Sequence, residues 1–136
     1  GKPYHKEIAG KQTVNFNISH SGEFILEGFA VGMDIGVDVQ EMAECPDYRE
    51  IAENFYTAEE AEDVKNEGPD LFFQYWAAKE AYVKALGIGL GRGMDFFSVR
   101  NGKIAEKDKK DQDWFLYPVR IKGYAAYVAA HKKGDR

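Results

Sequence analysis

Residues 76–84 read WAAKEAYVK, and they lie within a longer stretch, residues 70–86, that has the periodicity of an α-helix. At about 100° per residue, one arc of this helix collects large apolar side chains, namely Leu71, Phe72, Tyr75, Trp76, Tyr82, Val83 and Leu86. Lys79 falls in the middle of that arc, whereas Glu80 and Lys84 lie one turn apart on its flank. The stretch therefore predicts a helix that packs against a core and projects a carboxylate and an ammonium from the edge of the buried surface.

Segments with strand character stand on both sides of this helix. Strands are expected at residues 14–18, 24–31 and 35–40, shorter helices at 47–55 and 57–65, and further strands at 96–100, 114–119 and 124–130. Thr57 and Glu60 have the spacing of a capping box, Asp70 is expected to cap the long helix, and Gly87 is expected to end it. Strands, then helices, then strands predict an α+β fold in which a largely antiparallel sheet packs against the long helix.

Length and composition restrict the class of protein. The 136 residues, of which 44% are hydrophobic and 14% aromatic, predict one domain, residues 1–136, with a substantial core. A net charge of −5 argues against a nucleic-acid partner, and no apolar run approaches the roughly 20 residues that span a bilayer. The single Cys45 forms no internal disulfide, which favours a reducing, cytoplasmic setting. The start at Gly1 fits processing, trimming or a fragment equally well.

Oxygen-bearing side chains gather in the predicted strand at residues 36–40. Asp38 and Gln40 share one face of this strand, and Glu80 adds a third oxygen ligand if the long helix packs there. Such hard ligands suit Mg²⁺ better than zinc or copper. Taken singly, Asp38 reads as a solvated residue at a strand end, and Glu80 with Lys84 reads as a surface ion pair worth about 0.2–0.5 kcal/mol.

Two further features need a partner. A buried ammonium is costly unless it is paired, so Lys79 is expected either to extend to the surface or to meet a carboxylate or phosphate. Residues 19–22, SHSG, follow a predicted strand, where hydroxyls, an imidazole and backbone N–H groups can bind an anion. An ordinary polar turn remains the alternative, and the absence of a Gly-x-Ser-x-Gly elbow argues against a Ser/His nucleophile.

Four blocks in fixed order carry a family resemblance. GKP at residues 1–3, FNISHSG at 16–22, GVDV at 36–39 and WAAKEAYVKALGIGL at 76–90 resemble the 4′-phosphopantetheinyl transferases of the surfactin-synthetase-activating type. The resemblance implies the fold of these enzymes. It also implies Mg²⁺-dependent transfer of phosphopantetheine from coenzyme A to a serine of an acyl or peptidyl carrier protein. By the same analogy Lys2, Ser19 and His20 contact coenzyme A phosphates, chiefly the 3′-phosphate.

The resemblance also assigns the metal and the base. Asp38 and Glu80 would hold Mg²⁺, with Gln40 beside them, and Glu80 would take the proton of the carrier serine directly or through a metal-bound water. Lys84 would contact the phosphates and stabilise the leaving group, and Lys79 would support the coenzyme site from behind. Family members often have glutamate at the position of Gln40, which predicts weaker metal affinity here. Glu41 could replace it only through a bulge, because it points the other way in a regular strand.

The second departure from the family is length. Its members normally have two similar halves with the active site between them, and this chain resembles only the second half. A missing half or a second copy would then complete the cleft, as self-assembly does in the short holo-acyl-carrier-protein synthases. A coenzyme A or carrier-protein binding module without turnover is the alternative, and a purely structural subunit is a third. By analogy the carrier is expected to dock near residues 42–55.

Overall fold

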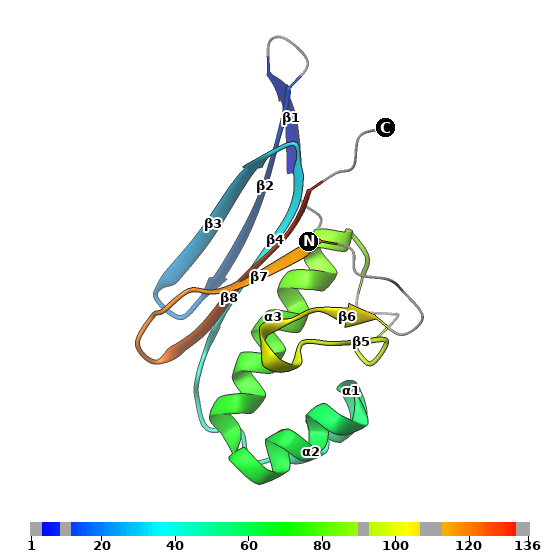
Figure 1. Ribbon diagram of the computed structural model, residues 1–136. Helices are drawn as coiled ribbons and strands as arrows, with labels where there is room; N and C mark the ends of the chain where they lie inside the picture. Colours follow the sequence, from blue (N-terminus) through cyan, green and yellow to red (C-terminus); the bar gives the residue numbers. More distant parts are fainter. Residues whose placement is uncertain (1–3, 9–11, 90–92, 107–112, 133–136) are drawn as a thin grey trace.

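Strands at both ends of the chain flank three helices, as the sequence predicts. The computed structural model describes residues 4–8, 12–89, 93–106 and 113–132 (Figure 1). In chain order the elements are β1 (Tyr4–Ile8), β2 (Gln12–Ser21), β3 (Phe24–Val31), β4 (Met33–Glu41), α1 (Tyr48–Phe55), α2 (Ala58–Glu67), α3 (Pro69–Leu86), β5 (Phe97–Ser98), a 3₁₀ turn (Arg100–Gly102), β6 (Ala105–Glu106), β7 (Trp114–Pro118) and β8 (Tyr124–Lys132). None of the helices in these ranges is both long and apolar enough to cross a membrane.

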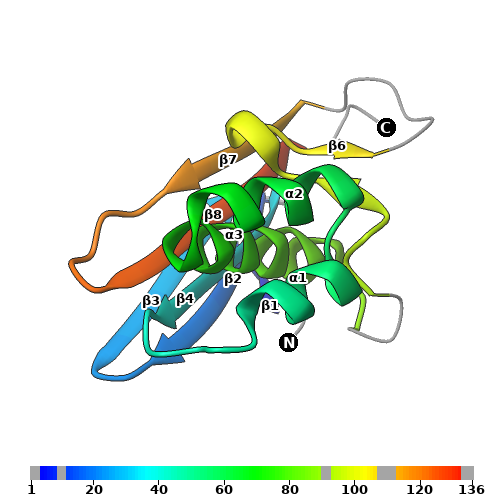
Figure 2. The same ribbon diagram turned by 90° about the horizontal axis from the view of Figure 1, so that it is seen from below.

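The strands form two antiparallel sheets of three strands each and one small ribbon. Their orders are β1-β2-β3, β4-β8-β7 and β5-β6, which confirms the α+β class while dividing the expected sheet in two. Helix α3 packs against β4 and β8, and α1 and α2 lie near the N-terminal end of α3 (Figures 1 and 2). The sheet β1-β2-β3 packs on the other side of β4.

A glycine allows α3 to approach β4 closely. A Cβ atom at Gly36 would lie 2.0 Å from the backbone oxygen of Ala81 and 2.5 Å from the backbone nitrogen of Ala85. Because side chains alternate along a strand, Asp38 faces α3 as Gly36 does. The close packing at Gly36 therefore brings the side chains at the edge of α3 next to Asp38.

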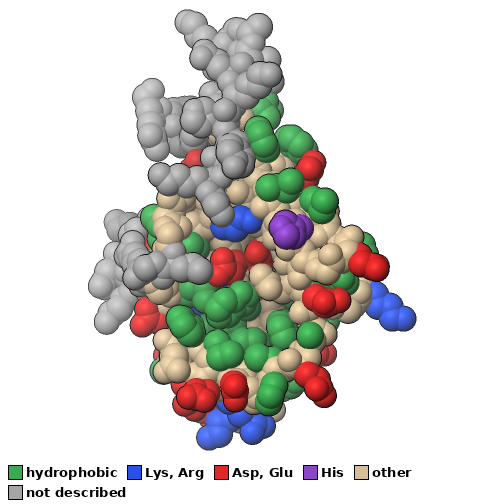
Figure 3. All heavy atoms as spheres, turned by 180° about the vertical axis from the view of Figure 1, so that it is seen from behind, with side chains coloured by type: hydrophobic (Ala, Val, Ile, Leu, Met, Phe, Trp, Pro, Cys, Tyr) green, Lys and Arg blue, Asp and Glu red, His purple; other side chains and the backbone are tan. Residues whose placement is uncertain are grey.

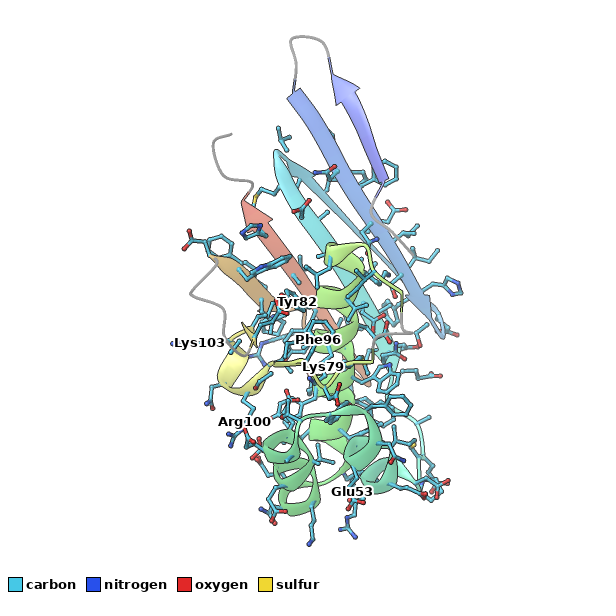
Figure 4. All side chains as sticks on the ribbon, turned by 90° about the vertical axis from the view of Figure 1, so that its right-hand side faces the viewer. Glu53, Lys79, Tyr82, Phe96, Arg100 and Lys103 are labelled. Atoms are coloured by element: carbon cyan, nitrogen blue, oxygen red, sulfur yellow. The ribbon has the colours of Figure 1, made fainter. Side chains whose placement is uncertain are left out.

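Lys79 is fully buried, and its ammonium meets a carboxylate. Its Nζ lies 2.7 Å from Glu60 Oε1 and donates to the carbonyls of Met94 at 2.7 Å and Phe97 at 2.6 Å. The other Glu60 oxygen accepts from the Val99 N–H at 2.7 Å. In Figure 4 the Lys79 side chain lies between α3 and the segment that carries Phe96. This ion pair joins α2, α3 and residues 94–99.

Helix ends follow the predicted chemistry with one exception. The Thr57–Glu60 capping box is present at the start of α2, and Gly87 ends α3 in the left-handed region with φ 72°. Asp70 was expected to cap α3, and this prediction is wrong. The helix begins one residue before Asp70, at Pro69, and its N-cap is Gly68. Proline suits the first helical position because its missing N–H has no partner there in any case.

The strand boundaries contain a second correction. The segment predicted as a polar turn, residues 19–22, mostly continues β2 through Ser21, and the turn itself falls at Gly22 and Glu23. The Ser19 and Ser21 hydroxyls accept hydrogen bonds from the backbone of β4, which gives these polar residues partners within a strand. The strand predicted at 96–100 is short, since Arg100–Gly102 forms a 3₁₀ turn.

Candidate functional site

Polar side chains of β2 fasten the two sheets together. Every second side chain from residue 15 to residue 21 bonds to the backbone of β4. Asn15 Nδ2 donates to the Met33 carbonyl, whereas the N–H groups of Val37, Val39 and Glu41 donate to Asn17 Oδ1 (2.8 Å), Ser19 Oγ (3.1 Å) and Ser21 Oγ (2.8 Å). The backbone N–H groups on the edge of β4 away from β8 thereby gain partners. The alternating pattern N-x-N-x-S-x-S was the available sequence signal for this junction, but its role needed the structure.

Asp38 lies at this junction as a buried carboxyl, with 5% of its surface exposed. Ser19 Oγ donates to its Oδ1 at 3.3 Å, and Gln40 Nε2 donates to its Oδ2 at 2.8 Å. Burial raises the pKa of Asp38 to about 7, and the charge of Glu80 also raises it, whereas the Gln40 hydrogen bond and the charge of Lys84 lower it. The carboxyl is thus held in place while its negative charge is only partly compensated.

Glu80 and Lys84 reach this junction from α3. Lys84 Nζ donates to the carbonyl of Ile18 at 2.8 Å and to that of Val37 at 2.7 Å, so it links β2 to β4. Burial lowers the pKa of Lys84, which the charges of Asp38 and Glu80 raise. Burial likewise raises the pKa of Glu80, and Lys84 lowers it. In Figure 3 acidic and basic side chains lie together above an apolar area on one face of the molecule.

The residues predicted to contact phosphate do not all lie beside Asp38. Ser19 meets Asp38, but the next residue, His20, lies on the opposite face of β2, where it is exposed and pairs in register with Ile25. Adjacent strand residues point to opposite faces, so the two do not converge through β2 itself. Lys2 lies outside the described residues. All three N–H bonds of Lys79 are directed at protein oxygens, which favours a supporting role over direct contact with a ligand.

Of the predicted metal ligands, Asp38 and Gln40 lie side by side, and Glu80 is close enough for its charge to act on Asp38. Glu41 is exposed near Tyr124, whose hydroxyl lies 3.3 Å from Glu41 Oε2. Residues 33–41 pair one to one with β8 without an extra residue, so Glu41 stays on the other face of β4. Gln40 donates its Nε2 to Asp38, so its amide oxygen is the atom that it could offer to an ion.

These residues fit Mg²⁺ shared with a phosphate ligand. Within the described ranges no group of three or more His, Cys, Asp and Glu side chains is arranged to hold a metal alone. Mg²⁺ does not need such a group, because one or two carboxylates commonly bind it together with substrate phosphates and water. The partly compensated charge of the buried Asp38 provides one such carboxylate, and Glu80 provides the second.

The raised pKa of Asp38 predicts a pH-dependent response to Mg²⁺. The folded-state pKa of about 7 exceeds the ordinary value of 3.8. Between about pH 4 and pH 7 the unfolded chain has therefore lost the Asp38 proton while the folded protein still holds it. The stability of the metal-free fold falls as the pH rises through this range. A bound Mg²⁺ would require the ionised form of this carboxylate, since metal ligands must be deprotonated. We therefore expect Mg²⁺ to raise the melting temperature more at pH 8 than at pH 6.

Asp38→Asn tests this link in a melting experiment with and without Mg²⁺. The variant should be more stable than the wild type at pH 8 without metal, by an amount of the order of 1 kcal/mol, and should lose the response to Mg²⁺. Asp47→Asn, at an exposed position before α1, serves as the control and should keep that response. An equal effect of Mg²⁺ on Asp38→Asn and wild type would show that the ion binds elsewhere.

Comparisons with known proteins agree with the resemblance in the sequence. The family model for the 4′-phosphopantetheinyl transferase superfamily matches residues 34–130. A 4′-phosphopantetheinyl transferase of Bacillus subtilis strain 168 is 38% identical over 74% of this chain and 44% of its own length. A putative 4′-phosphopantetheinyl transferase of Synechocystis is 39% identical over 59% of this chain and 34% of its own length.

A mammalian relative matches over more of the chain. The L-aminoadipate-semialdehyde dehydrogenase-phosphopantetheinyl transferase of Rattus norvegicus is 29% identical over 96% of this chain and 52% of its own length. The chain thus spans between about a third and a half of the length of these curated relatives. The family match includes β4, α3 and β8, the elements that place Asp38, Glu80 and Lys84. This chain belongs to the 4′-phosphopantetheinyl transferase superfamily.

Proposed function

We propose that this chain carries the metal-binding and proton-accepting side of a site that transfers 4′-phosphopantetheine from coenzyme A to a carrier protein. The observation that supports the proposal most is the meeting of Asp38 on β4 with Glu80 and Lys84 on α3, where the charges of both α3 residues act on the Asp38 carboxyl. Two carboxylates and an ammonium at one place suit a reaction that moves a phosphoryl group with the help of Mg²⁺.

In the proposed reaction, the serine hydroxyl oxygen of an acyl or peptidyl carrier protein attacks the phosphorus atom that bears pantetheine. A bond forms between that oxygen and phosphorus, the bond to the second phosphate breaks, and adenosine 3′,5′-bisphosphate leaves. Glu80 accepts the serine proton, directly or through a water, and its raised pKa suits a general base. Mg²⁺, when bound by Asp38 and Glu80 with Gln40 beside them, neutralises charge on the pyrophosphate.

Lys84 and β2 serve the phosphates of coenzyme A in this proposal. A lysine ammonium has three N–H groups, and two of those on Lys84 donate to the carbonyls of Ile18 and Val37. The third can stabilise charge on the leaving phosphate. Ser19, His20 and Lys2 are proposed as contacts to the other phosphates, chiefly the 3′-phosphate, and Lys79 supports α3 from within the core.

An apolar cavity favours a docking place for the carrier near the predicted segment 42–55. The cavity has a volume of about 430 Å³, and its lining includes Met42, Cys45, Pro46, Tyr48 and Phe73. Met42 follows β4, two residues beyond Gln40, so a carrier seated here would lie close to the metal strand. Apolar docking also suits an acidic chain, whose net charge of −5 gives no general attraction to an acidic carrier.

The cleft around this site is proposed to need a second part. Because the chain spans between about a third and a half of its relatives' length, a missing half or a second copy would supply the opposite wall. A module that binds coenzyme A or a carrier without turnover is the second candidate. It is favoured by the same short span and by Gln40. The Gln40 amide brings one negative charge fewer to the proposed metal site than a glutamate would, which predicts weaker metal affinity.

The mass of a carrier protein tests the proposal. We expect an apo carrier, incubated with this chain, coenzyme A and Mg²⁺, to gain the mass of phosphopantetheine. Glu80→Gln and Asp38→Ala should each reduce the rate at least about a hundredfold, because they remove the proton acceptor and a metal ligand. Melting curves should show that both variants remain folded.

Glu59→Gln, an exposed glutamate in the first turn of α2, is the matched control and should keep the wild-type rate. Near-normal transfer by Glu80→Gln or Asp38→Ala would overturn the assignment of the site. If the carrier gains no mass at any concentration of the chain, turnover by the chain alone is excluded. Saturable, Mg²⁺-dependent binding of coenzyme A under those conditions would then support the binding module.

A further inference from the structure

The turn that joins β7 to β8 is a basic part of an acidic protein. Residues 114–132 include Arg120, Lys122 and Lys132 but no aspartate or glutamate, whereas the whole chain has a net charge of −5. Arg120 and Lys122 are exposed, and within the part of the chain that the structure describes neither forms an ion pair. The turn projects beside α3 (Figures 1 and 2). Its two cations are therefore available to an anionic partner.

A second cavity, with a volume of about 550 Å³, lies against this turn. Several of the side chains that line it carry N–H or O–H donors, namely Arg120, Lys122, Gln74 of α3 and Tyr127 of β8. Burial raises the pKa of Tyr127, so its hydroxyl keeps its proton. An arginine fork matches the geometry of a carboxylate. The second cavity therefore suits a ligand that carries carboxylates.

Backbone hydrogen bonds hold the turn next to the end of β4. The Met42 N–H donates to the Gly123 carbonyl at 2.9 Å, and the Tyr124 N–H donates to the Ile121 carbonyl at 3.0 Å. Gly123 has the left-handed conformation, with φ 81°, that glycine adopts without strain. Met42 lies two residues beyond Gln40, which the proposed function places beside the metal. The cations of the turn are thereby held at a defined place relative to the metal strand.

The second cavity adjoins the apolar cavity in which the carrier is proposed to dock, because Met42 lines both. The lining of the apolar cavity also includes the carboxylates of Glu44 and Asp70, so the two cavities differ in the sign of their charge. We infer that the carrier protein lies across Met42, with an apolar side chain in the first cavity and carboxylates bound to Arg120 and Lys122 in the second. This inference rests on the proposed function.

Charge favours an acidic protein surface over a nucleic acid as the occupant of the second cavity. Two cations neutralise only a few phosphates, and the rest of a nucleic acid would face an acidic chain. Carboxylates of a carrier need only these two cations. Because Arg120 and Lys122 are exposed, ion pairs to them would be screened by salt and would act on partner choice and association rate.

Fluorescence anisotropy of a labelled carrier tests the inference without requiring transfer. The probe is an acidic acyl carrier protein whose acceptor serine is replaced by alanine, titrated with the full chain in the presence of coenzyme A and Mg²⁺. Arg120→Glu and Lys122→Glu should each raise the Kd for the carrier at least about fivefold at low salt, and the difference from wild type should shrink as salt is added. Coenzyme A binding should be unchanged in both variants.

Lys103→Glu is the matched control, because it makes the same change of charge at an exposed position outside both cavities. It should bind the carrier as the wild type does. A carrier in which one acidic residue near the serine is replaced by lysine should bind Lys122→Glu or Arg120→Glu more tightly than the unaltered carrier does. Such a rescue identifies a direct pair, whereas a general effect of net charge would move Lys103→Glu equally.

Three results would overturn the inference. They are the absence of carrier binding, equal weakening by Lys103→Glu and the two turn variants, and self-association of the chain that Lys122→Glu abolishes, which would assign the turn to a second copy. The carrier mass assay separates the inference from the proposed function. Carrier binding that depends on Arg120 and Lys122 without transfer would support the docking surface and count against the transferase. Transfer that neither substitution affects would support the transferase and overturn the docking surface.

Discussion

Gly36→Ala is expected to destabilise the fold by at least about 3 kcal/mol, at the upper end of the effects of overpacking. The added methyl would lie 2.0 Å from the Ala81 backbone oxygen and 2.5 Å from the Ala85 nitrogen. Backbone atoms within a helix cannot turn aside as a side chain can. Helix α3 would have to move away from β4, which would also separate Glu80 and Lys84 from Asp38.

Urea unfolding of the two proteins measures this effect, and Gly89→Ala is the control. A Cβ atom at Gly89 would meet no atom within 4 Å, so its replacement should change the free energy of unfolding by less than about 1 kcal/mol. If Gly36→Ala were as stable as Gly89→Ala, the close packing of α3 on β4 would not determine the site as we describe it.

Lys79→Met is expected to cost about 3–5 kcal/mol, the range for removing one partner of a buried ion pair. The substitution leaves the fully buried Glu60 carboxylate without its cation. It also removes the donor to the carbonyls of Met94 and Phe97. The same unfolding experiment measures the loss.

A double variant separates charge from packing at this pair. Lys79→Met with Glu60→Gln removes both charges and should be more stable than Lys79→Met alone. Lys65→Met, at an exposed position near the end of α2, should have little effect. A Lys79→Met variant as stable as Lys65→Met would contradict the account of the ion pair as the link between α2, α3 and residues 94–99.

The part of the site that follows from helix and strand periodicity was predictable from sequence. The arc of α3 places Lys79 among apolar side chains, where it was expected to extend to the surface or to meet a carboxylate or phosphate. It also places Glu80 and Lys84 as neighbours at its edge, and alternation in β4 places Asp38 beside Gln40. The structure confirms these positions. Periodicity works here because α3 and β4 are regular and because Gly36 brings them into direct contact.

Features that depend on tertiary pairing were not predictable in the same way. Glu60 is identified by sequence as part of a capping box, and only the fold shows that its carboxylate also meets Lys79. Ser19 and His20 suggest a polar turn, because nothing in their own residue types reveals that β4 offers N–H groups to bond Ser19 and Ser21. The division into two sheets has the same origin, since β2 joins β4 through side chains rather than through a backbone ladder.

Calorimetric titration with coenzyme A at pH 8 tests the central claim most directly. That claim is that Asp38, Glu80 and Lys84 form a site for Mg²⁺ and the coenzyme phosphates, and the titration needs neither a carrier nor a second half. We predict saturable heat in the presence of Mg²⁺, much less without it, and none for Asp38→Ala, which should still be folded. Absence of heat in the wild type, or equal heat from wild type and Asp38→Ala, would contradict the account.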